Sequence, residues 1–269
     1  MKTSSELSKV SPKLKSTLMA CLKEGGSIIR HAYGRAHSIR KKSPVSLVTE
    51  TDMAADRAIR RRILKAFPDH GIMTEEQAAV ESRSPYRWII DPLDGTTNFA
   101  HQIPLFAVSI GLEYQGDIVM GGIYNPVLKE LFFAEKGKGA LLNGKRIRVS
   151  RTGSIIDSLL VTGFPYDRQK KARFYLKFVQ GFMQRCRGVR RLGAASIDLA
   201  YVACGRFEAY WEFNLKPWDM AAGKLIVQEA GGRVTDFKGG PVDVDLPAQT
   251  LASNVRVHKK MLRIFLKYL

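Results

Sequence analysis

Apolar positions recur along this chain with helical spacing in some segments and as short runs in others. Residues 10–33 and 52–66 carry apolar side chains every three or four positions, which predicts two amphipathic helices. Beyond them, short apolar runs predict strands at residues 88–90, 105–113, 117–124, 131–134 and 146–149. Gln115-Gly116 and Asn143-Gly144 are turn sequences between these strands. The stretch 34–48 is basic and rich in turn residues, and we expect a loop there.

In the second half of the chain, amphipathic segments alternate with short apolar runs. The pattern predicts helices at 168–185, 196–204, 219–230 and 257–268, and strands at 158–163, 207–211 and 233–236. This mixture of helix and strand predicts a layered body of the α/β or α+β class. A length of 269 residues suits one unit, residues 1–269, with a soft internal boundary near residue 150 that separates 1–150 from 151–269.

The composition is that of a globular protein, with 45% hydrophobic and 25% charged residues. No apolar run approaches the ~20 residues of a membrane helix, and the basic N-terminus lacks the apolar segment of a secretory signal. Cys21, Cys186 and Cys204 are widely spaced, which fits neither a disulfide framework nor a zinc site. We therefore expect a protein of the reducing cytoplasm, without membrane contact.

Positive charge exceeds negative charge by 18, and the excess is unevenly distributed. Residues 1–62 carry fourteen basic and five acidic residues, and residues 165–191 carry nine basic and one acidic. Such an excess favours contact with phosphates, nucleic acid or anionic surfaces. The acids gather in the middle of the chain, which suits an enzyme that attracts an anion and holds cations.

The segment with the clearest chemistry is Asp91-Pro92-Leu93-Asp94-Gly95-Thr96-Thr97-Asn98-Phe99, directly after an apolar strand. Two carboxylates three residues apart at a strand end can converge on one hard cation. The proline stiffens the turn, and the glycine lets the backbone fold tightly into the next segment. If that segment opens a helix, its free N–H groups face the bound anion. A capping turn rich in Asp and Thr is the alternative interpretation of the same pattern.

Further acids are needed to hold two divalent ions. Glu75-Glu76 lies upstream of the motif, and Asp219 lies downstream at the start of a predicted helix, where it could also serve as a cap. Carboxylates together with water suit Mg²⁺ or Mn²⁺, which prefer oxygen ligands.

Taken together, these segments resemble the inositol monophosphatase family of Mg²⁺-dependent, lithium-sensitive phosphatases. Five segments are similar to the family's motifs in the same order: Leu47–Asp52, Trp88–Phe99, Arg190–Leu199, Gly205–Glu212 and Pro217–Gly223. The spacing from Asp52 to Glu75 resembles bacterial members of the SuhB type. The resemblance implies a layered α-β-α-β-α sandwich and a homodimer.

The resemblance also implies roles for individual residues. Glu75 and the Leu93 carbonyl would bind a first metal, Asp91 would bridge two metals, and Asp94 and Asp219 would complete the second. Asp52 and Thr96 would form a hydrogen-bonded pair that orients the attacking water, with Glu75 beside them. The remaining residues would bind substrate: the amides of Gly95 and Thr96 at the phosphate, Lys41 near metal and phosphate, and Gly193, Ala194, Ala195 and Glu212 at the alcohol.

The mechanism implied is direct attack of water on phosphorus, because two or three metals can neutralise a phosphate ester and no nucleophilic triad is recognisable. The expected cofactor is Mg²⁺, with Mn²⁺ as a substitute and Li⁺ as an inhibitor, and the expected substrate is inositol monophosphate or a similar small phosphorylated polyol. Fructose 1,6-bisphosphatase and adenosine 3′,5′-bisphosphate phosphatase activities remain open alternatives. So does a SuhB-like contact with RNA or a transcription factor. The chain departs from the family pattern at Asp56, Thr74, Ala194 and Asn214, which leaves the substrate preference open.

Overall fold

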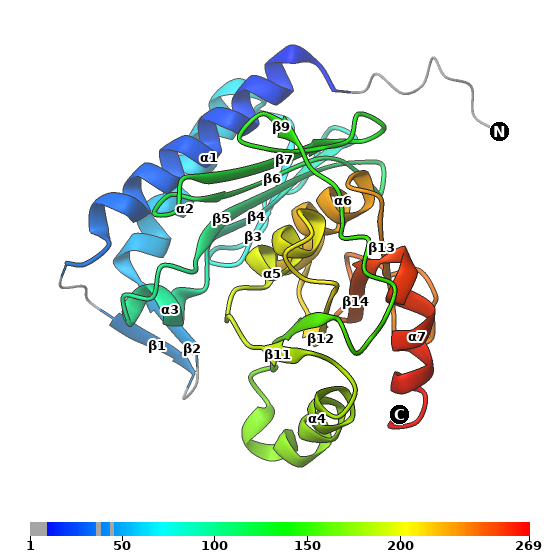
Figure 1. The fold of residues 1–269 in the computed structure, drawn as a ribbon. Helices are drawn as coiled ribbons and strands as arrows, with labels where there is room; N and C mark the ends of the chain where they lie inside the picture. The colour runs from blue at the N-terminus through cyan, green and yellow to red at the C-terminus, as the bar shows by residue number, and fades with distance from the viewer. Residues whose placement is uncertain (1–9, 36–38, 44–45) are drawn as a thin grey trace.

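Helices and sheets alternate in five layers in this protein (Figure 1). The structure is a computed structural model that describes residues 10–35, 39–43 and 46–269; the side chains of residues 39–48 and of residue 248 are not described. A helix pair covers one face of a seven-stranded sheet, a second pair lies between this sheet and a five-stranded one, and a third pair covers the far side. This arrangement confirms the layered fold that the resemblance implied.

The first layer contains α1 (Pro12–Ala32) and α2 (Glu50–Ala66). The α1 helix begins where the Ser11 side chain accepts a hydrogen bond from the Leu14 backbone N–H. The α2 helix begins after Thr49, which forms a reciprocal capping box with Asp52. Leu18 and Ile59 are fully buried in the core beneath these helices, so the two helices predicted from apolar spacing are confirmed.

The seven-stranded sheet runs in the order β3-β4-β5-β6-β7-β8-β9. Its strands are β3 (Gly71–Thr74), β4 (Tyr86–Asp94), β5 (Ala107–Tyr114), β6 (Asp117–Asn125), β7 (Glu130–Glu135), β8 (Ala140–Leu142) and β9 (Lys145–Arg146). The β3 strand pairs in parallel with β4, whereas the other neighbours are antiparallel. The predicted hairpin at Gln115-Gly116 is confirmed as the β5–β6 connection. At the end of β4, the five-residue helix α3 (Thr96–Ala100) begins.

The middle layer contains α5 (Ala195–Ala203) and α6 (Pro217–Glu229). Two glycines let α6 lie directly on the seven-stranded sheet. A Cβ atom added to Gly111 would lie 2.9 Å from the Ala221 Cβ, and one added to Gly121 would lie 3.0 Å from the Ala222 Cα. This close approach fixes the start of α6, and Asp219 with it, beside the ends of the strands.

The five-stranded sheet runs in the order β11-β10-β12-β14-β13. Its strands are β10 (Leu159–Thr162), β11 (Gly188–Arg190), β12 (Ala209–Leu215), β13 (Gly232–Thr235) and β14 (Ala248–Asn254). Its outer face is covered by α4 (Arg168–Met183) and α7 (Val255–Phe265), which bury Phe178, Trp211 and Phe265 in a separate aromatic core. The boundary expected near residue 150 stays a prediction.

Two expectations are wrong. Residues 34–48 do not form only a loop, because β1 (Ile39–Ser43) and β2 (Ser46–Thr49) pair as an antiparallel ribbon. A two-stranded ribbon needs no apolar alternation, so its pattern carries little signal. The strand expected at 146–149 ends at Arg146; the Val149 N–H bonds instead to the carbonyl of Ala230, at the end of α6.

Candidate active site

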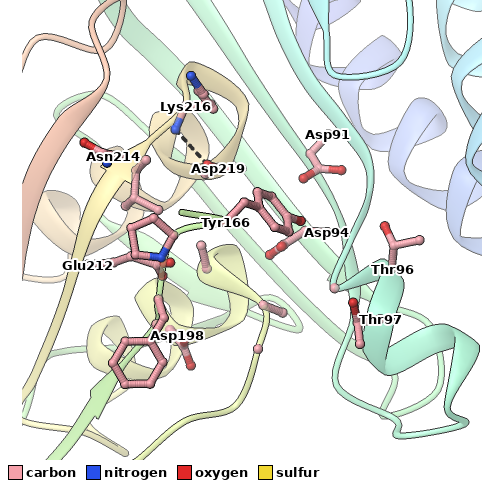
Figure 2. Close-up of a pocket in the computed structure, with 18 of the residues that line it drawn as sticks. Asp91, Asp94, Thr96, Thr97, Tyr166, Asp198, Glu212, Asn214, Lys216 and Asp219 are labelled. Atoms are coloured by element: carbon pink, nitrogen blue, oxygen red, sulfur yellow. Dashed lines mark hydrogen bonds between the residues drawn. The ribbon is translucent and has the colours of Figure 1, made fainter. Parts of the chain in front are cut away.

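A cavity of about 590 Å³ is lined by the ends of β4, β10 and β12 and by the starts of α3, α5 and α6 (Figure 2). Most residues proposed from the sequence line it: Glu75, Asp91, Leu93, Asp94, Gly95, Thr96, Gly193, Ala194, Ala195, Glu212 and Asp219. Asp52 is connected to these residues by a hydrogen bond with the Thr96 hydroxyl. The Lys41 backbone lies in β1, but its side chain is outside the described part of the chain.

Asp94 and Asp219 each hold the start of a helix. The Asp94 Oδ2 atom accepts hydrogen bonds from the backbone N–H of Ser196, at 2.7 Å, and from its hydroxyl, at the start of α5. The Asp219 Oδ2 atom accepts a hydrogen bond from the Lys216 N–H at 2.7 Å, at the start of α6. Since a helix N-terminus carries partial positive charge, both helices direct a favourable field toward an anion in the cavity.

Asp91 lies where the β4–β5 register shifts, between Asp91 and Asp94. Its Oδ1 atom accepts a hydrogen bond from the Leu93 N–H at 3.0 Å, which holds the carboxylate in place. Gly95 follows with a φ of +87°, and a Cβ atom there would lie 2.9 Å from the Leu105 carbonyl oxygen. The tight turn expected at this glycine is therefore confirmed, and it turns the chain directly into α3.

Glu75 reaches the same region from β3. Thr74 pairs with Ile90 in the parallel register of β3 and β4, and the Glu75 N–H bonds to the Ile90 carbonyl at 3.3 Å. Two neighbouring parallel strands thus deliver Glu75 and Asp91 to the same edge of the sheet. The sequence contained both acids, but the short β3 strand was not predicted.

The acids of the cavity repel one another and are poorly hydrated. Burial raises the pKa of the Asp91 carboxyl group well above its ordinary value, and the nearby Glu75 and Asp94 raise it further. Burial also raises the pKa of Asp94 to about 6, although the hydrogen bonds from Ser196 act to lower it. The pKa of Asp219 is raised by burial first and then by Asp94 and Glu75. A divalent cation among these carboxylates would relieve this repulsion.

The carboxylates line one cavity without closing around a common point. Within the described residues, no three Asp, Glu, His or Cys side chains are gathered as a ready-made metal cage. In the same part of the chain, Asp91, Asp94 and Asp219 form no ion pair with a Lys or Arg side chain. All candidate donors are oxygen atoms, which fits Mg²⁺ better than zinc.

Thr96 and Asp52 lie within hydrogen-bond distance across two elements. The Thr96 hydroxyl, in the first turn of α3, lies 3.1 Å from the Asp52 Oδ1 atom and 3.1 Å from the Leu93 carbonyl oxygen. Asp52 is fully buried, and its Oδ2 atom accepts a hydrogen bond from the Thr49 N–H at 2.8 Å. The capping box of α2 therefore fixes the carboxylate that faces Thr96.

The opposite half of the cavity contains Glu212, on β12. The Tyr210 hydroxyl donates a hydrogen bond to the Glu212 Oε2 atom at 2.7 Å, and burial raises the Glu212 pKa to about 7. A Cβ atom on Gly163 would lie 1.8 Å from that same oxygen, so a larger residue there would displace the carboxyl group. This half is joined to the β4 motif by Asn98, whose Nδ2 atom donates to the carbonyls of Leu105 at 2.7 Å and Leu192 at 2.8 Å.

Several cavity residues were not proposed from the sequence. Tyr166 and Arg168 follow β10, Arg191 precedes α5, and Asp198 lies in the first turn of α5. Arg191 and Asp198 fall inside a segment that resembled the family's substrate-binding half, which was the available signal. Tyr166 lies in the basic segment 165–191, where no motif singled out an individual residue.

Comparison with known proteins places this geometry in a family. The model of the inositol monophosphatase family matches residues 12–268. The chain belongs to the inositol monophosphatase family. It is therefore a phosphoric monoester hydrolase, and the activity predicted from the motifs is confirmed at this level.

Similar proteins match over most of their length. Nus factor SuhB of Pseudomonas aeruginosa is 46% identical over 230 residues, which cover 84% of each chain. Inositol-1-monophosphatase of Mesorhizobium japonicum is 42% identical over 249 residues, covering 91% of this chain and 93% of that one. The solved structure of the extragenic suppressor protein suhB from Bartonella henselae superposes with a TM-score of 0.91 at 40% identity, covering 95% of this chain and 99% of that chain.

Proposed function

We propose that this phosphatase hydrolyses inositol monophosphate, or a similar small phosphorylated polyol, with Mg²⁺ bound by Glu75, Asp91, Asp94, Asp219 and the Leu93 carbonyl. The observation that carries the proposal is the convergence of four acids from β3, β4 and α6 on one cavity. Burial raises the pKa values of three of these acids, Asp91, Asp94 and Asp219, which supports a site that is completed by cations. The name of the Mesorhizobium japonicum relative supports the same substrate.

When bound, divalent ions would neutralise the phosphate ester, acidify a water molecule and stabilise the leaving oxygen. The protein's own groups position the reactants. With its hydrogen directed to Asp52, the Thr96 hydroxyl offers a lone pair to a hydrogen of the attacking water. The backbone N–H groups at the start of α3 lack acceptors within the helix and would hold phosphate oxygens.

The leaving alcohol would lie on the side of Gly193, Ala194, Ala195 and Glu212. The hydrogen bond from Tyr210 holds the Glu212 carboxyl group, whose other oxygen is available for a hydroxyl of the alcohol. Asn98 keeps this half in register with the phosphate end, because it bonds to both. Such positioning supplies much of the rate gain in phosphoryl transfer.

The replacement of Asp91 by Asn tests the proposal directly. The Asp91→Asn variant keeps the shape of the side chain but removes a charge that would hold the metal. We expect inositol 1-phosphate turnover with Mg²⁺ to fall at least a hundredfold, about 3 kcal/mol in activation free energy, with an unchanged circular dichroism spectrum. Near-normal kcat in this variant would show that the metal site is assigned wrongly.

Contact with RNA or a transcription factor is a second proposal. It is supported by the net charge of +18 and by the name Nus factor SuhB, which relatives 41% to 46% identical carry. Homodimer formation and a cytoplasmic location are likewise proposals. A gel-shift titration with RNA across salt concentrations tests the RNA contact. Binding that disappears at physiological salt would show that the attraction is a nonspecific effect of charge.

A further inference from the structure

We propose that Tyr166 is a specificity-determining residue, whose ring packs against the ring of a cyclic polyol in the substrate's leaving group. The inference rests on the proposed function of the same cavity and adds to it the shape of the preferred alcohol.

Tyr166 is an exposed aromatic residue inside a concave site. Its side chain is 60% exposed and lines the cavity, and Figure 2 shows it projecting from the loop after β10 toward the side that carries Asp94. Pockets that bind small molecules are lined predominantly by apolar and aromatic side chains. A bound alcohol would remove the ring from water, which favours binding.

A cation lies against this ring. The Arg168 guanidinium carbon is 5.7 Å from the Tyr166 ring centroid, and the Arg168 Nη1 atom donates to the Pro165 carbonyl at 3.4 Å. Stacking of a guanidinium group on an aromatic face limits the rotamers of both side chains. The ring is therefore partly preorganised, which lowers the entropic cost of placing a ligand on it.

The loop that carries Tyr166 is fixed at both ends. The Asp167 Oδ1 atom accepts a hydrogen bond from the buried Tyr175 hydroxyl at 2.6 Å, and its Oδ2 atom pairs with Lys171 at 2.9 Å, so α4 holds the residue after the ring. At the other end, the Gly163 backbone passes directly over the Glu212 carboxyl group. The loop thus runs from the Glu212 carboxyl group to an aromatic ring that projects toward the side of Asp94, and both groups line the same cavity.

This pair of groups matches a cyclic polyol. Such a ring presents C–H bonds on its faces, which pack on aromatic rings, and hydroxyl groups at its edge, which donate to carboxylates. Glycerol 2-phosphate offers the same phosphate and free hydroxyls but no ring face. The contact with Tyr166 should therefore separate cyclic from acyclic alcohols that carry the same phosphate.

The test compares the Tyr166→Ala and Tyr166→Phe variants with the wild type on inositol 1-phosphate and glycerol 2-phosphate. For Tyr166→Ala we expect about a three- to tenfold loss in kcat/KM on inositol 1-phosphate, mostly through KM, and a change within about twofold on glycerol 2-phosphate. Tyr166→Phe, the matched control, keeps the ring and should stay within about twofold on both. Because the side chain is exposed, the melting temperatures should agree.

An equal loss on both substrates, or no loss on either, would overturn the role assigned to Tyr166. Failure of the wild type to hydrolyse either ester would instead overturn the proposed function. A measurement without turnover keeps the two apart. In ligand-detected NMR with myo-inositol as the probe, saturation should pass to the ring C–H protons in the wild type and weaken in Tyr166→Ala. Equal transfer in both proteins, or none in the wild type, would also contradict the proposal.

Discussion

At the scale of single residues, the acids of the cavity have two tasks at once. Asp52 completes the capping box of α2, Asp94 holds the start of α5, and Asp219 holds the start of α6. Each uses one carboxylate oxygen for a backbone N–H, which fixes the orientation of the group. From the sequence, a cap and a metal ligand were alternative interpretations of Asp219; the structure shows that the cap does not occupy the whole carboxylate.

Asp198 is an acid whose burial should cost stability. It is 1% exposed, and its Oδ1 atom has no hydrogen-bond partner within the described residues. Burial raises its pKa well above the ordinary value of 3.8, and the neighbouring Glu212 and Asp94 raise it further. A raised carboxyl pKa in the folded state means that stability falls as the pH rises above about 4.

We therefore predict that Asp198→Asn stabilises the protein against urea at pH 8 by about 0.5–2 kcal/mol, with a gain that shrinks toward pH 4. The control is Asp157→Asn, which makes the same charge change at a side chain that is 58% exposed and should stay within about 0.5 kcal/mol of the wild type. A destabilised Asp198→Asn variant at pH 8 would contradict this account.

At the scale of elements, long amphipathic segments were predictable and short polar ones were not. The spacing of Leu14, Leu18 and Leu22 identified α1 because these residues lie on its buried face. The β14 strand escaped detection, since Ala248–Asn254 is built from small and polar residues and has its place only between two other strands. Pairing across the sheet, rather than local pattern, decides such a strand.

One contact between elements makes stability depend on pH. His258 on α7 is 1% exposed and lies between the Ser253 Oγ atom, 2.7 Å from Nδ1, and the Thr235 Oγ1 atom, 3.0 Å from Nε2. Burial first, and then the nearby Arg233, lower its pKa from 6.5 to about 4. Below about pH 6.5 the unfolded chain binds a proton at this histidine that the folded protein does not.

Neutral His258 therefore contributes its full share of the free energy of unfolding above about pH 6.5, and this contribution is lost as the pH falls toward 4. We predict that urea unfolding at pH 7, 5.5 and 4.5 shows a smaller loss of free energy in His258→Gln than in the wild type. The difference between the two proteins isolates the histidine from the carboxyl groups. Identical pH slopes would refute the role given to this contact.

At the scale of the whole molecule, the site exists because two sheets and the helices between them bring distant segments together. The acids at residues 75, 91, 94 and 219 were identified from local motifs, since the turn after β4 and the start of α6 have distinctive sequences. Tyr166 and Arg168 could not be identified in this way, because their position depends on how the β10–α4 loop crosses Glu212. The motifs at the end of β4 and the start of α6 predict the reaction, whereas the packing of the β10–α4 loop determines which side chains would contact the alcohol.

Three further expectations concern membrane helices, the cysteines and the excess of positive charge. None of the described helices is long and apolar enough to span a membrane. The three cysteines are free, as their spacing predicted. The basic excess remains without a structural explanation at the cavity, where acids outnumber cations among the lining residues. A field of this sign outside an acidic site would attract an anionic substrate from solution.

Calorimetric titration of Mg²⁺ into the wild-type protein and the Asp91→Asn variant tests the central claim most directly, because it needs no substrate. If the carboxylates of this cavity hold the ion, the wild type binds Mg²⁺ saturably, and the variant binds it at least tenfold more weakly, about 1.4 kcal/mol, with an unchanged melting temperature in the absence of metal. Equal affinity in the two proteins, or no binding by the wild type, would contradict the account.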